Sequence, residues 1–249
     1  MMPEEARERF ELYSRLRLHR WRVAQAQRRV SEWLALVENP YIAFSTGKDS
    51  TCVLDLVREQ RRETPAVYFD AGCAYPESKE TLTSTKNVIV FPTLEPLLDT
   101  FRRYGGIEGG PALERETMRT TVYEPIRRLI EQYGFDGVAY GLRAEESHGR
   151  RMNAKMRGAV FQYKRDGLWG CQPIHDWTYS DVWAYIVTKR LPYCGVYDKM
   201  WDMPEADQRL SYWAGSTKRR WGRWAWLKRN YMELWNRLAS EFPEVKGFV

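Results

Sequence analysis

The segment from Tyr41 to Thr51, YIAFSTGKDST, constrains the fold more than any other part of the sequence. Four apolar residues lead into a loop of small residues and then into a helix-forming run, which predicts a buried strand that turns into a helix. Gly47 lets backbone N–H groups approach an anion, the first helical turn carries about half a positive charge, and Lys48 adds a full one. The loop and the first helical turn also carry the aliphatic hydroxyls of Ser45, Thr46, Ser50 and Thr51.

A strand-to-helix junction of this kind is typical of a phosphate-binding site, although the same residues could form an ordinary capped turn that binds nothing. The Walker A loop is excluded, because it requires a glycine five residues before its Gly-Lys pair and Ile42 occupies that position. The segment therefore predicts an anion-binding loop of another type.

The composition indicates an enzyme-sized globular chain with polyanionic partners. The 249 residues are 43% hydrophobic, which is ample for a core. A formal net charge of +6 and a pI of about 9.1 favour a nucleotide or a nucleic acid without choosing between them. No run of about 18 apolar residues appears and residues 1–9 lack the apolar part of a signal peptide, so we expect a cytoplasmic protein without a membrane partner.

The cysteines and histidines are scattered along the chain, and no CxxC pair occurs. This distribution argues against a disulfide framework and against a local zinc site. The residues concerned are Cys52, Cys73, Cys171, Cys194, His19, His148 and His175.

Beyond residue 40 the predicted strands alternate with predicted helices, which indicates an α/β fold. We expect a doubly wound, mainly parallel, Rossmann-like sheet with a helical N-terminal prefix over residues 4–37 and a helical C-terminal tail. The predicted strands span residues 41–45, 66–70, 88–91 and 137–141. The predicted helices lie near residues 50–62, 76–86, 94–104 and 117–133.

The second half of the chain changes pattern after Arg150. Residues 158–164 and 168–174 flank Arg165-Asp166-Gly167 and predict a hairpin. Thr178 and Asp181 resemble a capping box that opens a helix, and a last helix is expected over residues 224–240. We therefore divide the chain into a helical extension (1–39), a nucleotide-binding α/β domain (40–198) and a basic helical segment (199–249).

The C-terminal segment interleaves tryptophan with basic residues, as proteins that bind single-stranded nucleic acid do. A helix that packs its tryptophans on the core and leaves its arginines in solvent gives the same pattern, and we favour that interpretation. The residues are Trp213, Lys218, Arg219, Arg220, Trp221, Arg223, Trp224, Trp226, Lys228 and Arg229.

Ligands of open α/β sheets bind beyond the carboxyl ends of the strands, so Ser45, Asp70 and Gly141 should converge on one site. Asp70 could coordinate Mg²⁺ there, or could cap the next helix. Two arginines follow the fourth strand and could form bidentate contacts with anionic oxygens, or could pair with neighbouring glutamates. These residues are Arg143, Arg150, Glu145 and Glu146.

The loop Ser45-Thr46-Gly47-Lys48-Asp49-Ser50 resembles the PP-loop signature of the adenine nucleotide alpha hydrolase superfamily, with Thr46 in place of the usual first glycine. Later segments are similar to phosphoadenosine phosphosulfate (PAPS) reductases, in the order of that family. Asp70 matches the aspartate at the end of the second strand, and residues 141–150 match a Gly-x-Arg-x-acid-x-Ser-x-x-Arg segment. Residues 173–198 match its Pro-x-x-Asp-Trp-Thr and Pro-Tyr-x-x-x-Tyr-Asp motifs.

The resemblance covers about residues 41–198 and implies that the chain binds an adenine nucleotide, either ATP or PAPS, together with Mg²⁺. The second substrate is not indicated, and a homo-oligomer is compatible with the resemblance. The residues that it implies for the nucleotide are Ser45, Thr46, Gly47, Ser50, Thr51, Asp70, Gly141, Glu146, Ser147 and Arg150.

The sequence departs from the reductases at the residue that performs reduction. Those enzymes use a cysteine in a C-terminal Glu-Cys-Gly-x-His context, and no cysteine follows Cys194 here. Iron-sulfur relatives carry a Cys-Cys pair where this chain has Glu116-Thr117-Met118-Arg119, so no cluster is expected. Cys194 is the cysteine that we expect closest to the site, and we interpret it as a buried or idle thiol rather than a nucleophile.

Related PP-loop enzymes split ATP between its α and β phosphates. By that resemblance, Lys48 would offset charge on the leaving pyrophosphate, Asp49 or Asp70 would hold Mg²⁺, and Arg143 would contact the α phosphate or the second substrate. The alternatives are a PAPS reductase with a non-standard nucleophile and an accessory protein that binds or modifies nucleic acid.

Overall fold

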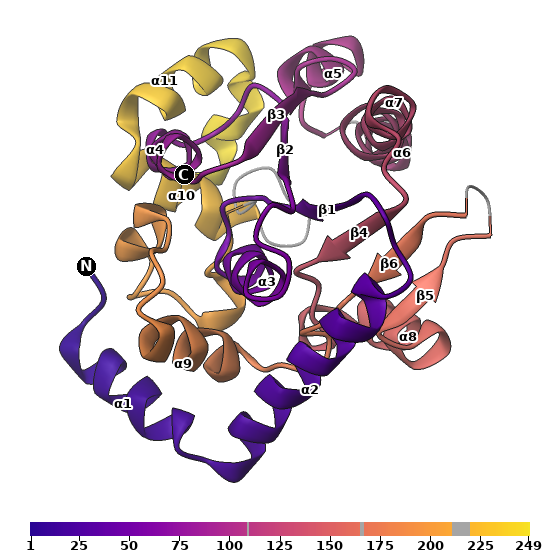
Figure 1. Cartoon of the computed structure of the whole chain (residues 1–249). Coiled ribbons are helices and arrows are strands. Elements are labelled where there is room, and N and C mark those ends of the chain that lie inside the picture. The colour runs from indigo at the N-terminus through magenta and orange to yellow at the C-terminus, as the bar shows by residue number, and fades with distance from the viewer. Residues whose placement is uncertain (109, 165–166, 211–219) are drawn as a thin grey trace.

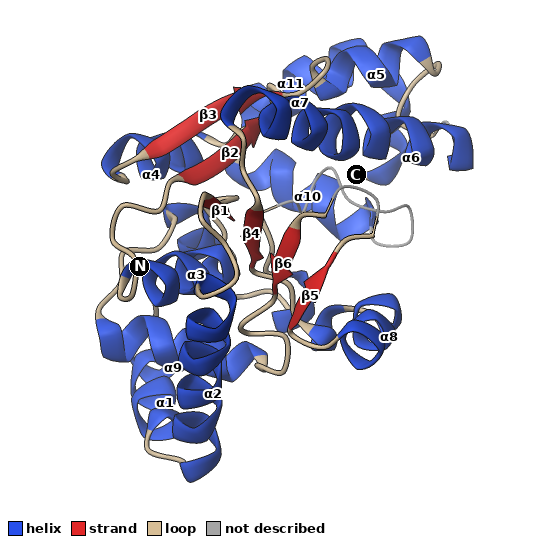
Figure 2. Cartoon of the chain, turned by 45° about the vertical axis from the view of Figure 1, so that its right-hand side comes forward, coloured by secondary structure: helices blue, strands red, loops and turns tan. Residues whose placement is uncertain are grey.

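The computed structural model describes residues 1–108, 110–164, 167–210 and 220–249 (Figure 1). Its centre is a six-stranded sheet in the order β3-β2-β1-β4-β6-β5, in which β5 alone runs antiparallel to its neighbour. Helices lie on both faces of this twisted sheet (Figure 2), so the predicted fold class is confirmed. The strands are β1 Pro40–Ala43, β2 Ala66–Asp70, β3 Val88–Pro92, β4 Gly137–Tyr140, β5 Val160–Gln162 and β6 Trp169–Cys171.

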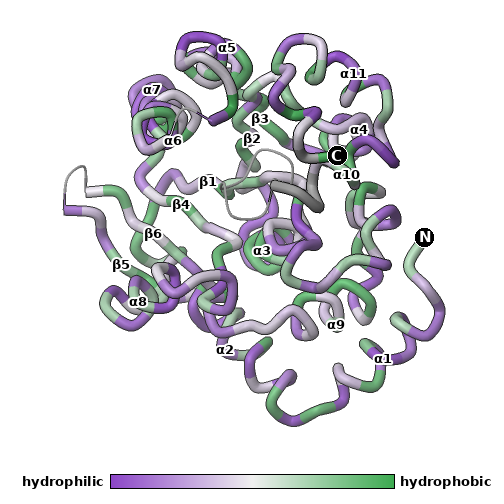
Figure 3. The backbone as a smooth tube through the Cα atoms, turned by 180° about the vertical axis from the view of Figure 1, so that it is seen from behind, coloured by the Kyte–Doolittle hydropathy of each residue, from purple (hydrophilic) through white to green (hydrophobic). Residues whose placement is uncertain are grey.

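Alternating side chains of the central strand β1 enter two different cores. Ile42 packs with helices α2 (Arg17–Leu34), α3 (Lys48–Arg58) and α9 (Tyr179–Lys189), whereas Tyr41 packs with Leu129 of α7 (Glu124–Tyr133). The hydrophobic colour follows the strands and the hydrophilic colour dominates α7 (Figure 3), as expected for a strand buried on both faces and a helix exposed on one.

The strand order reverses beside β1, since β2 and β3 lie on one side of it and β4 on the other. The chain connects these strands through α3, α4 (Pro76–Ser84), α5 (Leu97–Arg103), α6 (Gly110–Met118) and α7. A reversal of this kind leaves a crevice at the carboxyl ends of the central strands, which is where open α/β sheets bind their ligands.

One predicted helix, over residues 117–133, differs from the structure. The helical run begins earlier with α6, passes through a π-helical turn at Arg119–Tyr123, and only then continues as α7. Pro125 explains the interruption, because proline lacks the N–H that an α-helix would direct to the carbonyl four residues earlier.

The N-terminal prefix forms two helices: α1 (Glu4–Ser14) lies along α9, and α2 runs from α1 toward α3 and β6 (Figure 1). Phe10 of α1 stacks on Trp183 of α9 with ring centroids 6.3 Å apart. The described part of the chain contains no helix with the length and apolar character needed to span a bilayer.

Two further sequence expectations are confirmed after β4. Strands β5 and β6 form the predicted hairpin, although Arg165 and Asp166 of its turn lie outside the described residues. Thr178 and Asp181 form the predicted capping box of α9: the Thr178 N–H donates to the Asp181 carboxylate (2.8 Å), and the Asp181 N–H donates to Thr178 Oγ1 (3.2 Å).

The last predicted helix is two helices, α10 (Arg220–Asn230) and α11 (Met232–Glu241). Tyr231 separates them with non-helical φ and ψ angles of −142° and 63°. Its side chain is held by the body of the protein, because its hydroxyl donates to Glu77 (3.0 Å) and its ring lies 4.0 Å from the Lys199 ammonium. These tertiary contacts fix the bend, which helix propensity alone does not reveal.

Trp224 and Trp226 of α10 are buried, so for these residues the interpretation of the tail as part of the core is confirmed. The Trp226 indole N–H donates to the carbonyl of Lys199 (2.8 Å). Trp213, Lys218 and Arg219, as well as the side chains of Arg220, Trp221 and Arg223, lie outside the described residues.

Candidate functional site

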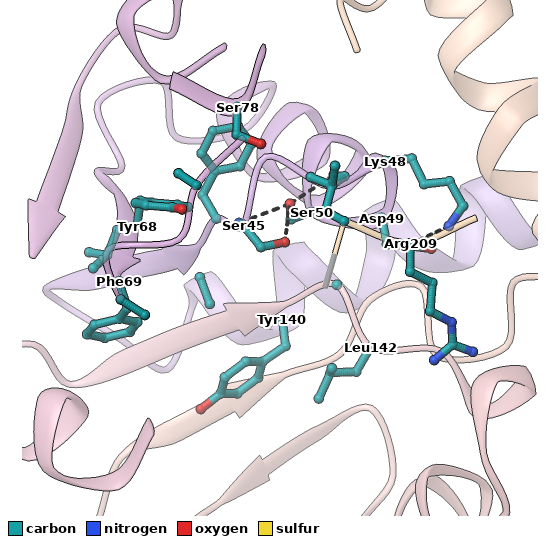
Figure 4. Close-up of a pocket in the computed structure, with 18 of the residues that line it drawn as sticks. Ser45, Lys48, Asp49, Ser50, Tyr68, Phe69, Ser78, Tyr140, Leu142 and Arg209 are labelled. Carbon is teal, nitrogen blue, oxygen red and sulfur yellow. Dashed lines mark hydrogen bonds and ion pairs between the residues drawn. The ribbon is translucent and has the colours of Figure 1, made fainter. Parts of the chain in front are cut away.

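A cavity of about 470 Å³ opens at the carboxyl ends of β1, β2 and β4 (Figure 4). Ser45 after β1 and Gly141 after β4 both line it, as the sheet geometry led us to expect, whereas Asp70 at the end of β2, which we expected to join them, does not. Its size lies within the usual range for small-ligand sites, about 300–1,000 Å³. The predicted phosphate loop therefore faces a space that can hold a nucleotide-sized ligand.

The two ends of this cavity differ in chemistry. One end is formed by apolar and aromatic side chains of β2, of the end of β4 and of the loop after β4. The other end is formed by the hydroxyls of the phosphate loop and by two arginines, of which Figure 4 labels Arg209. The apolar end includes Val67, Tyr68, Phe69, Tyr140 and Leu142, and the polar end includes Ser45, Ser50, Arg150 and Arg209. The arrangement suits a ligand that joins a flat ring system to an anionic group.

The hydroxyl groups of the loop form a small network. Ser50 Oγ accepts the N–H of Ser45 (3.2 Å) and donates to the carbonyl of Gly47 (2.9 Å). Thr51 Oγ1 also donates to the Gly47 carbonyl (3.1 Å), so this hydroxyl turns back onto its own helix. Ser45 and Ser50 thus line the cavity, whereas Thr51 holds the first turn of α3.

The strained position of the loop is Thr46 rather than Gly47. Thr46 has a φ of 59°, in the left-handed region, while the φ of Gly47 is −73°. The Thr46 side chain is buried, and its Oγ1 has no hydrogen-bond partner within the described residues. We had assigned the conformational freedom of this loop to Gly47, and the backbone requires it one residue earlier.

Lys48, Asp49 and Arg143 form a buried charge cluster beside the loop. Lys48 Nζ donates to Asp49 Oδ2 (3.0 Å) and to the carbonyl of Gln208 (3.3 Å), and Arg143 Nε donates to Asp49 Oδ1. Burial lowers the pKa of Lys48, against the opposing effect of Asp49. Burial acts to raise the pKa of Asp49, but Lys48 and Arg143 outweigh it and hold that pKa below its usual value.

The segment after β4 contains the ion pairs that we had considered as an alternative to ligand contacts. Arg143 pairs with Glu145, and Arg150 pairs with Glu146. Burial lowers the pKa of Arg150, with the nearby Arg209 acting in the same direction. Arg150 and Glu146 both line the cavity, so the pair forms part of its wall.

Ser147 has a structural role in this conformation. Its side chain caps helix α8 (His148–Arg157) by accepting the N–H of Arg150 (3.2 Å). Gly141 also has a packing role: a Cβ at this position would lie 2.7 Å from the backbone nitrogen of Ser50. The lack of a side chain at Gly141 therefore lets β4 approach the first turn of α3.

Asp49 and Asp70 have different surroundings as candidate Mg²⁺ ligands. Both carboxylate oxygens of Asp49 are engaged by Lys48 and Arg143. Asp70 is exposed, and its Oδ1 accepts the N–H of Gly72 (2.8 Å) instead of capping α4. In the described ranges no three His, Cys, Asp or Glu side chains gather as a metal site.

Several residues of the site were missed by the sequence reasoning. Tyr197 lines the cavity, and its hydroxyl accepts the N–H of Lys48 (3.0 Å) at the start of α3. Arg209 reaches the polar end from a segment without a recognisable motif. Cys73 lines the cavity, whereas Cys194 is buried with its Sγ 3.7 Å from Ser78 Oγ, so our expectation that Cys194 is the cysteine nearest the site was wrong.

A family model described as the phosphoadenosine phosphosulfate reductase domain matches residues 39–203. A PAPS reductase of Xanthomonas axonopodis pv. citri is 29% identical over 163 residues, which is 63% of this chain and 65% of that protein. A PAPS reductase of Aliivibrio fischeri is 29% identical over 182 residues, 70% of this chain and 69% of that protein. The chain thus spans about two thirds of the length of these relatives.

Solved structures show the same fold at low sequence identity. A PAPS reductase from Candida auris superposes with a TM-score of 0.54 and 14% identity, covering 80% of this chain and 92% of that one. An FMN adenylyltransferase from Candida glabrata, in complex with FAD and inorganic pyrophosphate, superposes with a TM-score of 0.53 and 10% identity. The match covers 77% of this chain and 66% of that one. At these identities the similarity concerns the fold alone.

Proposed function

Because this chain belongs to the phosphoadenosine phosphosulfate reductase domain family, we propose that it is an enzyme that binds an adenine nucleotide in the 470 Å³ cavity and acts on the α-phosphate of ATP. The observation that carries this proposal is the cavity itself, with its apolar end and its hydroxyl-lined end above the start of α3. An adenine ring fits between the side chains of Phe69, Tyr140 and Leu142, which leaves the phosphates at the loop.

The phosphate end offers three kinds of interaction. The N–H groups of Asp49 and Ser50 in the first turn of α3 lack acceptors within the helix, whereas the Lys48 N–H already donates to Tyr197. Ser45 and Ser50 add hydroxyl groups, and Arg150 and Arg209 add guanidinium donors. In this arrangement the loop holds the β and γ phosphates while an oxygen nucleophile takes the AMP group and pyrophosphate leaves.

The buried charge cluster supplies positive charge for the leaving group. Lys48 and Arg143 carry two positive charges that are withdrawn from bulk water, whereas of their two carboxylate partners only Asp49 is mostly buried and Glu145 is 47% exposed to solvent. Charges fixed in a site of low dielectric stabilise developing negative charge more than they would in water. Mg²⁺ that arrives with ATP would be held by the phosphates, with Asp70 as the accessible carboxylate.

Substitution of Lys48 by alanine tests this proposal. We expect pyrophosphate release from ATP to fall by about 100-fold or more, because one preorganised charge at the leaving group is lost. Pyrophosphate release and the Kd for ATP are measured on the same preparation. Lys86→Ala, which removes an exposed lysine from the loop between α4 and β3, distant in sequence from the phosphate loop, should leave both values unchanged.

The fold should survive Lys48→Ala, since Asp49 keeps its ion pair with Arg143, and circular dichroism checks this. Unchanged ATP binding and turnover in the folded variant would refute the proposed site. Sulfite release from PAPS in the presence of thioredoxin would instead establish reduction. Cys73 is the thiol on the cavity wall, but burial raises its pKa to about 12, so little thiolate forms at neutral pH.

A further inference from the structure

A second, smaller cavity of about 260 Å³ adjoins the nucleotide cavity. It is enclosed by the start of α3, the segment after β4, the start of α9 and the short helix Glu205–Asp207. Lys48, Glu146 and Arg209 line both cavities, so a ligand in the second would lie next to the phosphates of a nucleotide in the first. Figure 4 places Lys48 and Arg209 on the side of the site away from Tyr68 and Phe69.

The charges of this second cavity are sorted by depth. The side chains of Lys48 and Arg143 are 2% and 5% exposed and form a cationic inner wall. Among the described lining residues, the one buried carboxylate is that of Glu146, at 9%, and it is paired with Arg150 and Arg209. Glu145 and Glu205 are 47% and 51% exposed, so its rim is acidic. A ligand that complements this arrangement carries a negative group at its inner end and a positive group at its outer end.

The inner wall retains donors for a ligand. Arg143 Nε donates to Asp49, and Nη1 donates to Glu145 and to the carbonyl of Trp177 (3.5 Å). Within the described residues Nη2 has no acceptor, although the whole side chain is almost fully buried. Because Nη2 donates to no acceptor in the described part of the chain and Arg143 lines the second cavity, this group is suited to donate to a carboxylate of a ligand.

The volume limits the ligand to a small molecule. At about 30 Å³ per water molecule in the liquid, the cavity corresponds to about nine water molecules. This is the size of a short amino acid and is much smaller than a second nucleotide.

We propose that the second cavity binds the acceptor substrate, and that the acceptor is a small zwitterion of the α-amino acid class, with its carboxylate toward Lys48 and Arg143 and its ammonium toward Glu205. This inference rests on the proposed reaction at the α-phosphate. The transfer forms a bond between a carboxylate oxygen and the α-phosphorus and breaks the bond from that phosphorus to pyrophosphate. The carboxylate is already ionised, so no proton has to be removed.

Calorimetric titration tests the site independently of turnover. The twenty common amino acids are titrated as a mixture and then singly into the free protein and into protein saturated with an ATP analogue that cannot be cleaved. We expect at least one amino acid to bind, and analogues that lack either its ammonium or its carboxylate to bind much more weakly. We also expect pyrophosphate release to depend on the same amino acid.

Glu205→Gln tests the outer contact. We expect it to weaken binding of the amino acid about fivefold to tenfold, since one charged hydrogen bond is lost, and to weaken ATP binding much less. Glu233→Gln, at an exposed glutamate of α11, is the matched control and should change neither affinity.

The two proposals fail in different ways. If ATP binds and pyrophosphate is released but no amino acid binds at about 10 mM, the acceptor inference is wrong and the proposed function stands. If the protein binds the analogue without an ammonium as tightly as it binds the amino acid, the acceptor inference is also wrong, because the cavity would then bind anions in general. If ATP itself does not bind, the proposed function fails, and the titrations of the free protein still decide whether the zwitterion site exists.

Discussion

Thr46 combines two local features that each cost free energy in the ligand-free protein. A β-branched residue in the left-handed region costs about 1–2 kcal/mol, and a buried hydroxyl without a partner costs about 1–3 kcal/mol. Strain of this kind is often stored at functional sites. At the residue scale, Thr46 is therefore the position where the phosphate loop gives up stability for binding.

Replacing Thr46 by glycine separates stability from binding. We expect Thr46→Gly to raise the free energy of unfolding by about 1 kcal/mol, because relief of strain and of the buried hydroxyl exceeds the entropy cost of glycine. Thr46 does not line the cavity of the ligand-free protein, so weaker ATP binding by this variant would show that the loop turns the hydroxyl toward a phosphate oxygen when the nucleotide binds. Urea denaturation and calorimetric titration measure the two effects.

Thr46→Val is the matched control, because it keeps the β-branch and removes only the hydroxyl. It should retain the backbone strain and still bind ATP more weakly than the wild type. If Thr46→Gly destabilises the protein, the strain at Thr46 is smaller than the entropy cost of glycine. If both variants bind ATP as the wild type does, Thr46 has no part in binding.

At this scale the sequence predicted the residues of the loop but not their conformations. Ser45, Ser50 and Gly141 could be placed because strand ends of a parallel sheet converge by geometry. Tyr197 belongs to the Pro-Tyr-x-x-x-Tyr-Asp motif, but the motif did not indicate that Tyr197 lines the cavity, and Arg209 reaches the same cavity from a segment without a motif. Thr46 carries a signal in hindsight, because it stands where the family loop has glycine, the residue that tolerates a positive φ.

At the scale of secondary-structure elements, the site depends on how closely β4 approaches α3. A Cβ on Gly141 would lie 2.7 Å from the Ser50 nitrogen and 2.8 Å from the Asp49 carbonyl carbon. Both are backbone atoms of the first turn of α3, so neither can rotate away as a flexible side chain would. Any side chain at position 141 must move the helix that holds the phosphate loop.

We therefore expect Gly141→Ala to lower the free energy of unfolding by about 2 kcal/mol or more and to abolish measurable ATP binding. Gly149→Ala is the control, because a Cβ at that helical position meets no atom within 4 Å. Alanine there should leave stability unchanged or raise it by up to about 1 kcal/mol. Equal stability of the two variants in thermal denaturation would show that β4 and α3 tolerate a wider separation.

The elements themselves were largely predictable, and the exceptions have local or tertiary causes. The four predicted strands appear within a few residues of their expected limits, since apolar runs bounded by polar loops define them. The π-helical turn before α7 follows from Pro125, a signal that is visible in the sequence. The break at Tyr231 follows from contacts with Glu77 and Lys199, which are distant in sequence and could not be predicted.

At the scale of the whole molecule, the largest core crosses the boundary that we drew at residue 39. Phe10, Val30 and Trp33 of the prefix share it with Trp177 and Trp183. The division into three segments stays a prediction about sequence organisation. The shared core implies that the prefix and the α/β part lose their structure together on unfolding.

Asp181 is the polar link between these two parts. It is fully buried at the start of α9 and accepts hydrogen bonds from Thr178, while His19 and Arg22 of α2 contact its two carboxylate oxygens. Burial acts to raise the pKa of Asp181, but His19, Thr178 and Arg22 outweigh burial and lower it to about 2. The ionised carboxylate therefore holds the prefix against α9.

This lowered pKa predicts how stability depends on pH. A carboxyl whose pKa is lower in the folded protein than in the unfolded chain stabilises the fold above the unfolded value of 3.8, and this contribution is lost as the pH falls toward 2. The shift corresponds to about 2 kcal/mol. We expect Asp181→Asn to be less stable than the wild type by about 3 kcal/mol at pH 6, because it leaves Arg22 without its buried partner. The difference should shrink below about pH 4 in urea denaturation.

Asp202→Asn is the control for this prediction, since Asp202 forms an ion pair with Arg229 in which both side chains are 59% exposed. Its effect should stay within about 0.5 kcal/mol at every pH. A difference between Asp181→Asn and the wild type that does not change between pH 6 and pH 3 would mean that packing, rather than the ionised carboxylate, is what Asp181 contributes. If instead the difference shrinks with acid, the ionised carboxylate of Asp181 helps to hold the N-terminal helices against α9, and acid should unfold the helices and the sheet in one transition.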